Sequence, residues 1–524
     1  MKKLASVLLN LVLFVILSFA VSVVAVLLMS YVDIIFTVSV ESSWAVYGVA
    51  AVAFLVSVYL YFIFIKNKSG ALTGSALAGA SGAGAGLKSL FVYIIIIGGA
   101  VACYVIAVLI NSHVFGAMAE KEKAALAQYG VTSEWKSFFP DMDYKDPENA
   151  APHIEAAGKL FTDADDKEVT RLWDMVTGEK EYDRVKAMDD IKKLSEKTAK
   201  PMEALEKAVG YKKFLWDDIK AKDGRYGHSS VRIPQFSTFK RFSRIEMLEA
   251  MRAANGGNWT EAGTRISKII AITDMLEQDP WLVSYLIRVA DMKIIYNGLV
   301  SIAKNAKDKK AALEFARKVS GDIRPMKDSF SRAMGAEFSG MVALSEALNT
   351  GVILEESFVS SGGWTEKYAT LAYYRAFGKW DAYVFMRGAG LIMPGASERD
   401  LVKRKADNEM VDKFFAEHTA LPALFATIGT PAFSPYFKRE LQAEAERDIA
   451  LLFASALVYK AKHGKYPETL DKLAPEYMSV IPKNPLKNAP YVYKTSGEYM
   501  EIIAEPDGED KPIIAIIGER PKQQ

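Results

Sequence analysis

The sequence predicts a mainly α-helical protein with three transmembrane helices, an irregular helical region and a small C-terminal α+β module. Three observations predict this class: long apolar runs lie before residue 112, helix-period apolar stripes dominate the middle, and strand-like segments appear near the end. The chain has 524 residues, of which 50% are hydrophobic and 24% are charged. These averages alone indicate an ordinary globular protein, because they hide the uneven distribution.

Residues 1–115 contain three apolar segments that are long enough to cross a bilayer, which takes about 20 helical residues. They cover about residues 4–32, 45–65 and 90–110. The first segment could also be read as a secretory signal peptide, but the apolar part of such a peptide has only about 7–15 residues. We therefore expect a multi-pass membrane anchor with the lipid bilayer as a partner.

Lysine placement predicts how this anchor is oriented, since short cytoplasmic loops carry the excess of basic residues. Lysines precede the first segment and flank the loop at 66–88, whereas the connection at 33–44 has two acidic residues and no basic one. We therefore expect a bacterial inner-membrane protein with a cytoplasmic N-terminus. Residues after about 111 are expected to be periplasmic.

The loop at 66–88 is rich in glycine and alanine, and Lys88-Ser89 follows it. This invites comparison with a phosphate-binding loop, but Leu87 separates Gly86 from Lys88 and no strand precedes the glycines. We interpret the segment as a flexible cytoplasmic linker.

Charge and cysteine usage exclude several classes of function. Residues 1–111 carry a net charge of +3 and the remainder a net charge of −1, so the large remainder lacks the basic character of a nucleic-acid-binding protein. The only cysteine, Cys103, permits neither an internal disulfide nor a thiolate zinc site. The five histidines are scattered singly, which makes a metalloenzyme improbable.

The middle of the chain reads as successive helices, which we divide into a first helical region at 116–235 and a helical array at 236–437. The clearest pair spans Arg241–Asp279, where two apolar stripes flank the turn Asn255–Asn258. This pair is similar to a tetratricopeptide-type hairpin, but no 34-residue repeat is present. We expect an irregular, solenoid-like extracytoplasmic array.

Aromatic and methionine side chains are dense in one part of this array. They could line a groove for a peptide or a lipid, although residues at helical spacing more often form the core. The residues concerned are Trp364, Tyr373, Tyr374, Trp380, Phe385 and Met386.

The C-terminal module is predicted at 438–524. Apolar residues recur at steps of three and four along Arg439–His463, and Gly464 follows where a glycine commonly ends a helix. Tyr491–Lys494, Tyr499–Ala504 and Ile513–Ile517 read as strands. The pattern predicts one long helix and a small sheet.

The segment "YKAKHGKYPETLDKL" followed by "YMSVIPKNPLKNAPYVYKTSGEYMEI" resembles the globular region of the major pseudopilins of type II secretion systems. The resemblance covers about residues 440–504 and rests on Gly464, Tyr466, Pro467, Leu470, Leu473, Pro482, Pro485, Tyr491 and Tyr493. It implies a small antiparallel sheet packed on the long helix. Because the first residues, MKKLASVLLNLVLF, contain no pilin-type cleavage site, we do not expect polymerisation by the usual pseudopilin route.

The wider chain resembles a group of uncharacterised bacterial envelope proteins of the Planctomycetes type. The likeness rests on two sequence segments, Asp146–Phe161 and Ile233–Phe242, together with the apolar N-terminus and the pseudopilin-like end. The likeness implies an architecture and no activity.

Major pseudopilins bind calcium in a loop of their terminal sheet. In a comparable place this chain has Asp507, Glu509 and Asp510, whose oxygens suit Ca²⁺. The alternative is a solvated acidic turn, which is a common use of such residues. We expect no other cofactor.

These patterns favour a membrane-anchored periplasmic structural or interaction protein, associated with a secretion or pilus-like envelope assembly and binding an envelope protein or itself. The alternatives are a periplasmic enzyme of unknown reaction and a subunit of an oligomeric transporter. His228 lies near Asp223 and Ser229, and His418 follows Glu417, but neither histidine belongs to a nucleophile motif. We therefore do not expect an enzyme.

Overall fold

The computed structural model describes residues 99, 104–105, 107–138, 145–178, 182–216, 236–324, 329–350, 364–396, 410–411, 413–414, 417–418, 434–506 and 511–520. The chain divides into two compact units. The first consists of Met1–Gln128, Leu344–Gly390 and Met410–Pro431, and the second of Tyr129–Ala343, Leu391–Glu409 and Ala432–Gln524. The described residues are mainly helical and include one three-stranded sheet.

In the first unit, a π-helical turn η1 (Asn111–Phe115) leads into α4 (Gly116–Ala127), and both lie near α14 (Trp364–Ala396). The Asn111 side chain donates to the carbonyl oxygen of Arg375 at 2.9 Å and accepts from the N–H of Lys379 at 3.0 Å. The ring of Phe115 lies 5.1 Å from that of Trp380. Trp380, Phe385 and Met386 are buried, so these aromatic-rich positions belong to the core.

The prediction of three transmembrane helices is wrong for the part of the chain that the structure describes, since no helix there is both long and apolar enough to cross a membrane. The predicted spans at about 4–32 and 45–65 lie outside the described residues, as does most of the span at about 90–110. Beyond Ile110 the described helix continues through Asn111 and into the charged segment of α4, which ends the apolar run.

The long helices of the described residues are unsuited to lipid because charged residues interrupt them. α14 contains Arg375, Lys379 and Asp381, and α11 (Leu282–Asn305) contains Arg288 and Asp291. The multi-pass fold class is therefore corrected to a mainly helical one with a small sheet. The inner-membrane location and the periplasmic placement were inferred from those spans and are corrected with them.

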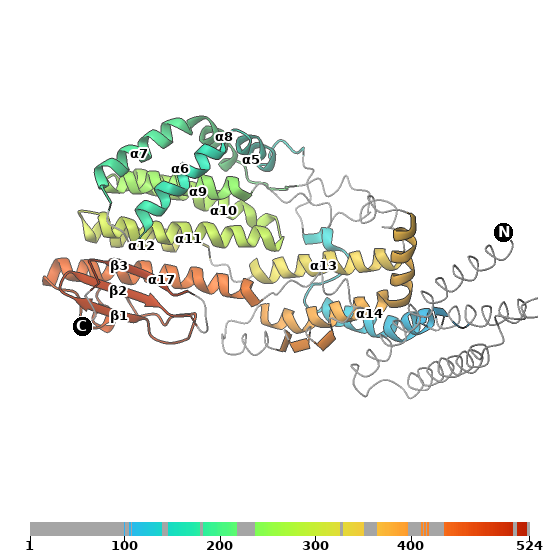
Figure 1. Cartoon of the computed structure of the whole chain (residues 1–524). Coiled ribbons are helices and arrows are strands. Elements are labelled where there is room, and N and C mark those ends of the chain that lie inside the picture. The colour runs from blue at the N-terminus through green and yellow to red at the C-terminus, as the bar shows by residue number, and fades with distance from the viewer. Residues whose placement is uncertain are drawn as a thin grey trace, which may run out of the picture. The chain divides into compact units, whose positions relative to one another are not determined.

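The second unit is built in layers, which Figure 1 shows from top to bottom. The uppermost helices are α5 (Ala151–Gly158), α6 (Asp163–Thr177), α7 (Arg184–Lys197) and α8 (Ala199–Val209). Below them lie α9 (Phe236–Asn255) and α10 (Trp259–Met275), then α11 with α12 (Lys309–Asp322), and then α17 (Ser434–His463). Other elements are η2 (Trp135–Phe138), η4 (Leu276–Gln278), η7 (Leu470–Leu473) and α13 (Ser329–Thr350), whose residues from Leu344 on belong to the first unit.

The predicted helix pair is present as α9 and α10. The turn between them uses Gly257 at φ 81°, a left-handed conformation that costs glycine little. Asn258 then caps α10, because its side chain accepts from the N–H of Glu261 at 3.1 Å. The ring of Trp259, the first residue of α10, lies 5.4 Å from that of Phe315 on α12.

α11 is the central helix of this unit, since it packs against α9 on one side and α17 on the other. Its buried residues are therefore distributed around the helix rather than along one stripe. Lys293 of α11 forms an ion pair with Glu446 of α17 at 3.2 Å, and Tyr285 donates to Glu440 at 3.1 Å.

The C-terminal module packs its sheet on the other face of α17. Gly464 ends that helix at φ 76°, and its N–H donates to the carbonyl oxygen of Lys460 at 2.8 Å. β1 (Val492–Ser496), β2 (Tyr499–Ala504) and β3 (Ile513–Ile517) form an antiparallel sheet in that order. One hydrophobic core joins Phe453 of α17 to Ile502 and Ala515 of the sheet.

Candidate functional site: a cationic groove between α6 and α9

The groove lies between α6 and α9, and a well-capped N-terminus fixes its α6 wall. Thr162 and Asp165 form a capping box, in which the Thr162 N–H donates to Asp165 at 2.8 Å and the Asp165 N–H donates to the Thr162 hydroxyl at 3.3 Å. Val169, Leu172 and Trp173 then bury one face of α6. Because this face is fixed by packing, the polar residues beside it hold defined positions along the groove.

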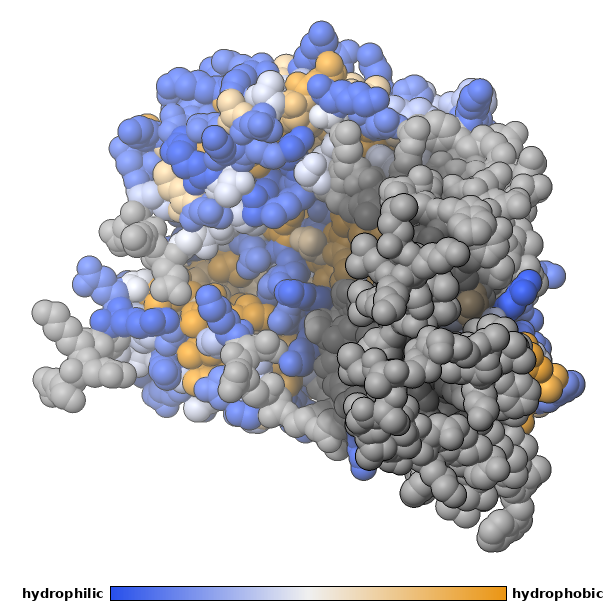
Figure 2. All heavy atoms as spheres, turned by 45° about the vertical axis from the view of Figure 1, so that its right-hand side comes forward, coloured by the Kyte–Doolittle hydropathy of each residue, from blue (hydrophilic) through white to orange (hydrophobic). Residues whose placement is uncertain are grey.

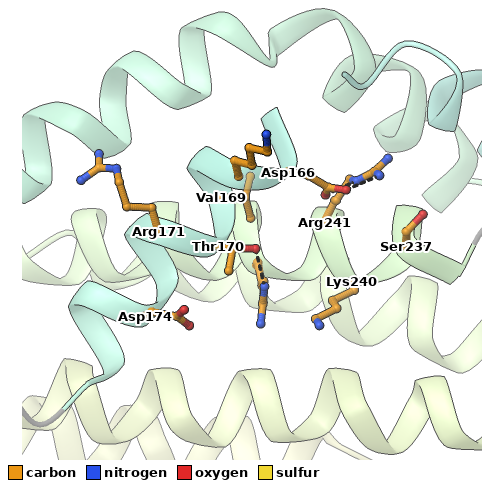
Figure 3. A pocket seen from close by; sticks show the side chains of 10 residues that line it. Asp166, Val169, Thr170, Arg171, Asp174, Ser237, Lys240 and Arg241 are labelled. Atoms are coloured by element: carbon orange, nitrogen blue, oxygen red, sulfur yellow. Dashed lines mark hydrogen bonds and ion pairs between the residues drawn. The ribbon is translucent and has the colours of Figure 1, made fainter. Parts of the chain in front are cut away.

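The α9 wall is a helix with a buried stripe and a basic margin. Phe239 and Phe242 are fully buried, whereas Lys240 and Arg244 lie one helical turn apart beside them. The groove has a volume of about 540 Å³. Figure 3 shows Thr170 and Asp174 of α6 on one side and Lys240 of α9 on the other. Its lining residues are Asp166, Lys167, Val169, Thr170, Arg171, Asp174, Ser237, Lys240, Arg241 and Arg244.

Two of the lining arginines are neutralised within the chain. Arg241 forms a two-pronged ion pair with Asp166, and its guanidinium lies 5.5 Å from the centre of the Phe161 ring. Arg171 pairs with Glu168 at 2.7 Å and with Asp190 at 3.3 Å. These two arginines therefore contribute little net positive charge to the groove.

Arg244 is different, because its guanidinium meets a hydroxyl and an aromatic ring but no carboxylate at ion-pair distance among the described residues. It donates to the Thr170 hydroxyl at 3.1 Å and lies 5.7 Å from the centre of the Trp173 ring. Its Nε is buried and has no hydrogen-bond partner in the described structure. Burial lowers the pKa of Arg244, against the opposing influence of Asp174 and Asp166.

Two further cations of the groove, Lys167 and Lys240, are exposed and form no ion pair with any described residue. Among the lining carboxylates, only Asp174 is likewise exposed and forms no ion pair with a described residue. The described groove thus presents three unmatched cations against one unmatched acid, with the hydroxyls of Thr170 and Ser237 between its walls. Such an arrangement attracts anions and can donate several hydrogen bonds to carboxylate oxygens.

The described residues contain no cluster of three or more histidine, cysteine or acidic residues that could hold a metal ion. The predicted calcium ligands, Asp507, Glu509 and Asp510, lie outside the described residues. So do His228, Asp223 and Ser229. His418 lies with its Nδ1 at 2.8 Å from the carbonyl oxygen of Phe414 and its ring stacked on that residue at 4.2 Å.

The residues that carry the pseudopilin resemblance lie between the middle of α17 and its C-terminal end and in the segment that follows. Tyr466, Leu470, Leu473 and Tyr491 are buried in the core that α17 shares with the sheet. Tyr493 donates to the carbonyl oxygen of Pro467 at 2.9 Å. Pro482 and Pro485 flank Asn484, whose side chain donates to the carbonyl oxygen of Glu505 at 2.7 Å. These residues therefore hold the module together.

Sequence reasoning missed the cationic groove and a set of buried acids. Asp279 and Asp291 are fully buried, and burial raises the pKa of each to about 7. Burial likewise raises the pKa of Glu446 to about 7 despite its ion pair with Lys293. The available signals were Lys240, Arg241 and Arg244 within one helical turn, and acids interrupting apolar helical stretches.

No protein-family model, curated protein or solved structure matches this chain.

Proposed function

We propose that the chain is a protein-interaction scaffold whose groove between α6 and α9 binds an acidic segment of a partner protein. The observation that carries the proposal is the group of unmatched cations Lys167, Lys240 and Arg244 along two packed helices. Unmatched charge at a surface costs little in water but attracts an opposite charge, so these side chains gain most from a ligand with carboxylates.

The groove is also prepared for binding in its geometry. Arg244 is positioned by the Trp173 ring and the Thr170 hydroxyl, so less side-chain entropy is lost when its remaining donors meet a carboxylate. Lys167 and Lys240 come from opposite walls, which favours a ligand lying between the helices. These features support binding rather than catalysis.

The C-terminal module supports a scaffold role in a second way. α17 packs along α11 and α12, and the sheet covers its other face. We propose that this pseudopilin-like module serves as a cap on the helical array in an assembly related to secretion or pili. The resemblance at Gly464, Tyr466 and Pro467 motivates that association.

The groove can be tested by fluorescence anisotropy of a labelled oligoglutamate peptide titrated with the full chain. We expect binding that weakens as salt is raised, since the attraction is electrostatic. Lys240→Glu replaces an attraction by a repulsion and should weaken binding by about tenfold, given about 0.2–1 kcal/mol for each exposed charge pair. Arg244→Gln should weaken it similarly.

Lys310→Glu is the matched control, because Lys310 is an exposed lysine on α12 whose side chain is 79% accessible. It makes the same change in net charge outside the groove and should leave binding almost unchanged. Equal loss in Lys240→Glu and Lys310→Glu would mean that only net charge matters. An oligoglutamate peptide that does not bind the parent chain would refute the proposal.

A further inference from the structure

The two edges of the C-terminal sheet differ in how they are protected from pairing with another strand. Edge strands expose unpaired N–H and C=O groups, and proteins commonly block them with charged residues, prolines or bulges. β1 follows this rule, since Lys494, Thr495 and Ser496 are polar and exposed. β3 does not, because Ile513–Ile517 contains only isoleucine and alanine.

The outer edge of β3 is open in the described structure. β3 pairs only with β2, with Ala515 opposite Ile502, and no other described backbone group bonds to it. Ala515 faces the α17 core, and the four isoleucines are half-buried. Figure 2 shows hydrophobic side chains gathered in the lower left, over this module, whereas the surface above is mostly hydrophilic.

The order of residues in β3 is the same in both directions. Ile513-Ile514-Ala515-Ile516-Ile517 is a palindrome centred on Ala515. An antiparallel pair of two such strands about a two-fold axis at Ala515 therefore places alanine opposite alanine and isoleucine opposite isoleucine. Cross-strand pairs of β-branched residues are favourable, and a two-fold interface requires this kind of self-complementarity.

The flanking charges fit the same register. The chain turns at Gly518 (φ 80°), so beyond β3 the antiparallel pairing brings Lys511 near Glu519 of the second copy, and the reverse pair forms at the other end. Both side chains are exposed and form no ion pair with any described residue. The register that matches the isoleucines thus also matches the charges.

We propose that β3 pairs edge to edge with β3 of a second copy of this chain, forming a continuous six-stranded antiparallel sheet across a two-fold axis at Ala515. About four to six main-chain hydrogen bonds would join the copies, because alternate residues of a strand direct their N–H and C=O groups to each side. This self-association is independent of the groove between α6 and α9.

The test is a charge-exchange experiment on the full chain, read by sedimentation velocity over a wide range of concentrations. Lys511→Glu and Glu519→Lys each turn two attractions in the dimer into two repulsions, so each variant alone should dimerise about tenfold more weakly. The double variant restores both attractions and should dimerise like the parent. Both residues are exposed, so the folded chain is expected to tolerate either change.

Mixing the two single variants gives the sharper result. In a mixed dimer, both ends pair a lysine with a glutamate, so an equimolar mixture should dimerise more strongly than either variant alone. Lys472→Glu, an exposed lysine of the same module, is the control and should leave dimerisation unchanged. A parent chain that stays monomeric, or a dimer insensitive to these exchanges, would overturn the proposal.

A second measurement fixes the register. Lys511→Cys combined with Glu519→Cys should give a covalent dimer on mild oxidation. The two positions in one copy lie beyond opposite ends of β3, which is itself about 17 Å long, too far apart for an internal disulfide. The parent chain, which keeps its single Cys103, measures background cross-linking. Cross-linking no greater than this background would contradict the register.

Discussion

Ionisable side chains without an ion-pair partner lie in opposite environments on the two sides of α9. In the groove with α6, Lys240 and Arg244 remain without carboxylate partners at ion-pair distance. On the side that packs against α10 and α11, Asp291 is fully buried and has no described cation at ion-pair distance; the Thr273 hydroxyl lies at 3.4 Å and the Ser243 hydroxyl of α9 is also beside it. The difference lies in access to water: a solvated cation keeps its charge and attracts a ligand, whereas a buried acid tends to keep its proton.

The largest expected effect tests whether the buried core on the α10 and α11 side of α9 extends through α17. Phe453 is fully buried between the helical array and the sheet. Phe453→Ala should lower the free energy of unfolding by about 3–5 kcal/mol, because it removes a large apolar side chain and leaves a cavity. Chemical denaturation measures this, with the exposed Val480→Ala as a control of small effect. A loss below about 1 kcal/mol would show that α17 is not part of this core.

The next effect concerns the buried acids and depends on pH. The pKa of Asp291 is raised to about 7, so between about pH 4 and pH 7 the folded chain binds more protons than the unfolded chain. Stability is therefore highest at low pH in this window and falls as pH rises. Asp279 and Glu446 act in the same direction.

Asp291→Asn removes one of these titrations while keeping the shape and the hydrogen bonding of the side chain. We expect the variant to be more stable than the parent by about 4 kcal/mol at pH 8, and nearly equal to it at pH 4. Thermal unfolding at both pH values gives the comparison. Asp322→Asn, at the exposed end of α12, should show no such difference. A variant that is less stable than the parent at pH 8 would contradict the assignment.

The smallest effect concerns the solvated groove between α6 and α9. Thr162→Ala removes the hydroxyl that caps α6 and should lower stability by about 1 kcal/mol. Because α6 forms one wall of the groove, oligoglutamate binding should weaken as well. Thr264→Ala serves as the control, since that exposed hydroxyl bonds only within α10. If stability falls and binding does not, the capped N-terminus is not what positions the groove.

Local patterns in the sequence predicted local structure well. The helix pair that became α9 and α10 is marked by two apolar stripes and Gly257, and the long C-terminal helix ends at Gly464 as expected. The division at Thr198 between α7 and α8, in contrast, was not predicted within the helical region at 116–235. The available signal was Pro201, which cannot donate to the carbonyl of the preceding turn.

Features that depend on distant parts of the chain could not be predicted. The groove joins α6 to α9 across about 70 residues of sequence, so the spacing of Lys240 and Arg244 predicts a basic helix margin and nothing more. Asp291 is visible in an apolar stretch, but only the packing of Thr273 beside it shows that the carboxyl is enclosed. The apolar N-terminal runs predicted membrane spans, but these runs lie almost wholly outside the described residues, and no described helix is long and apolar enough to cross a membrane.

The packing of α17 on α11 has a consequence during synthesis. A ribosome completes α11 at Asn305 and the last residue of α17 at His463, about 160 residues later. At about 5–20 residues per second, one face of α11 stays exposed for roughly 10–30 seconds before α17 has been synthesised. During that interval the nascent chain presents apolar surface that chaperones recognise, and Leu282–Asn305 is the segment on which we expect them to bind first.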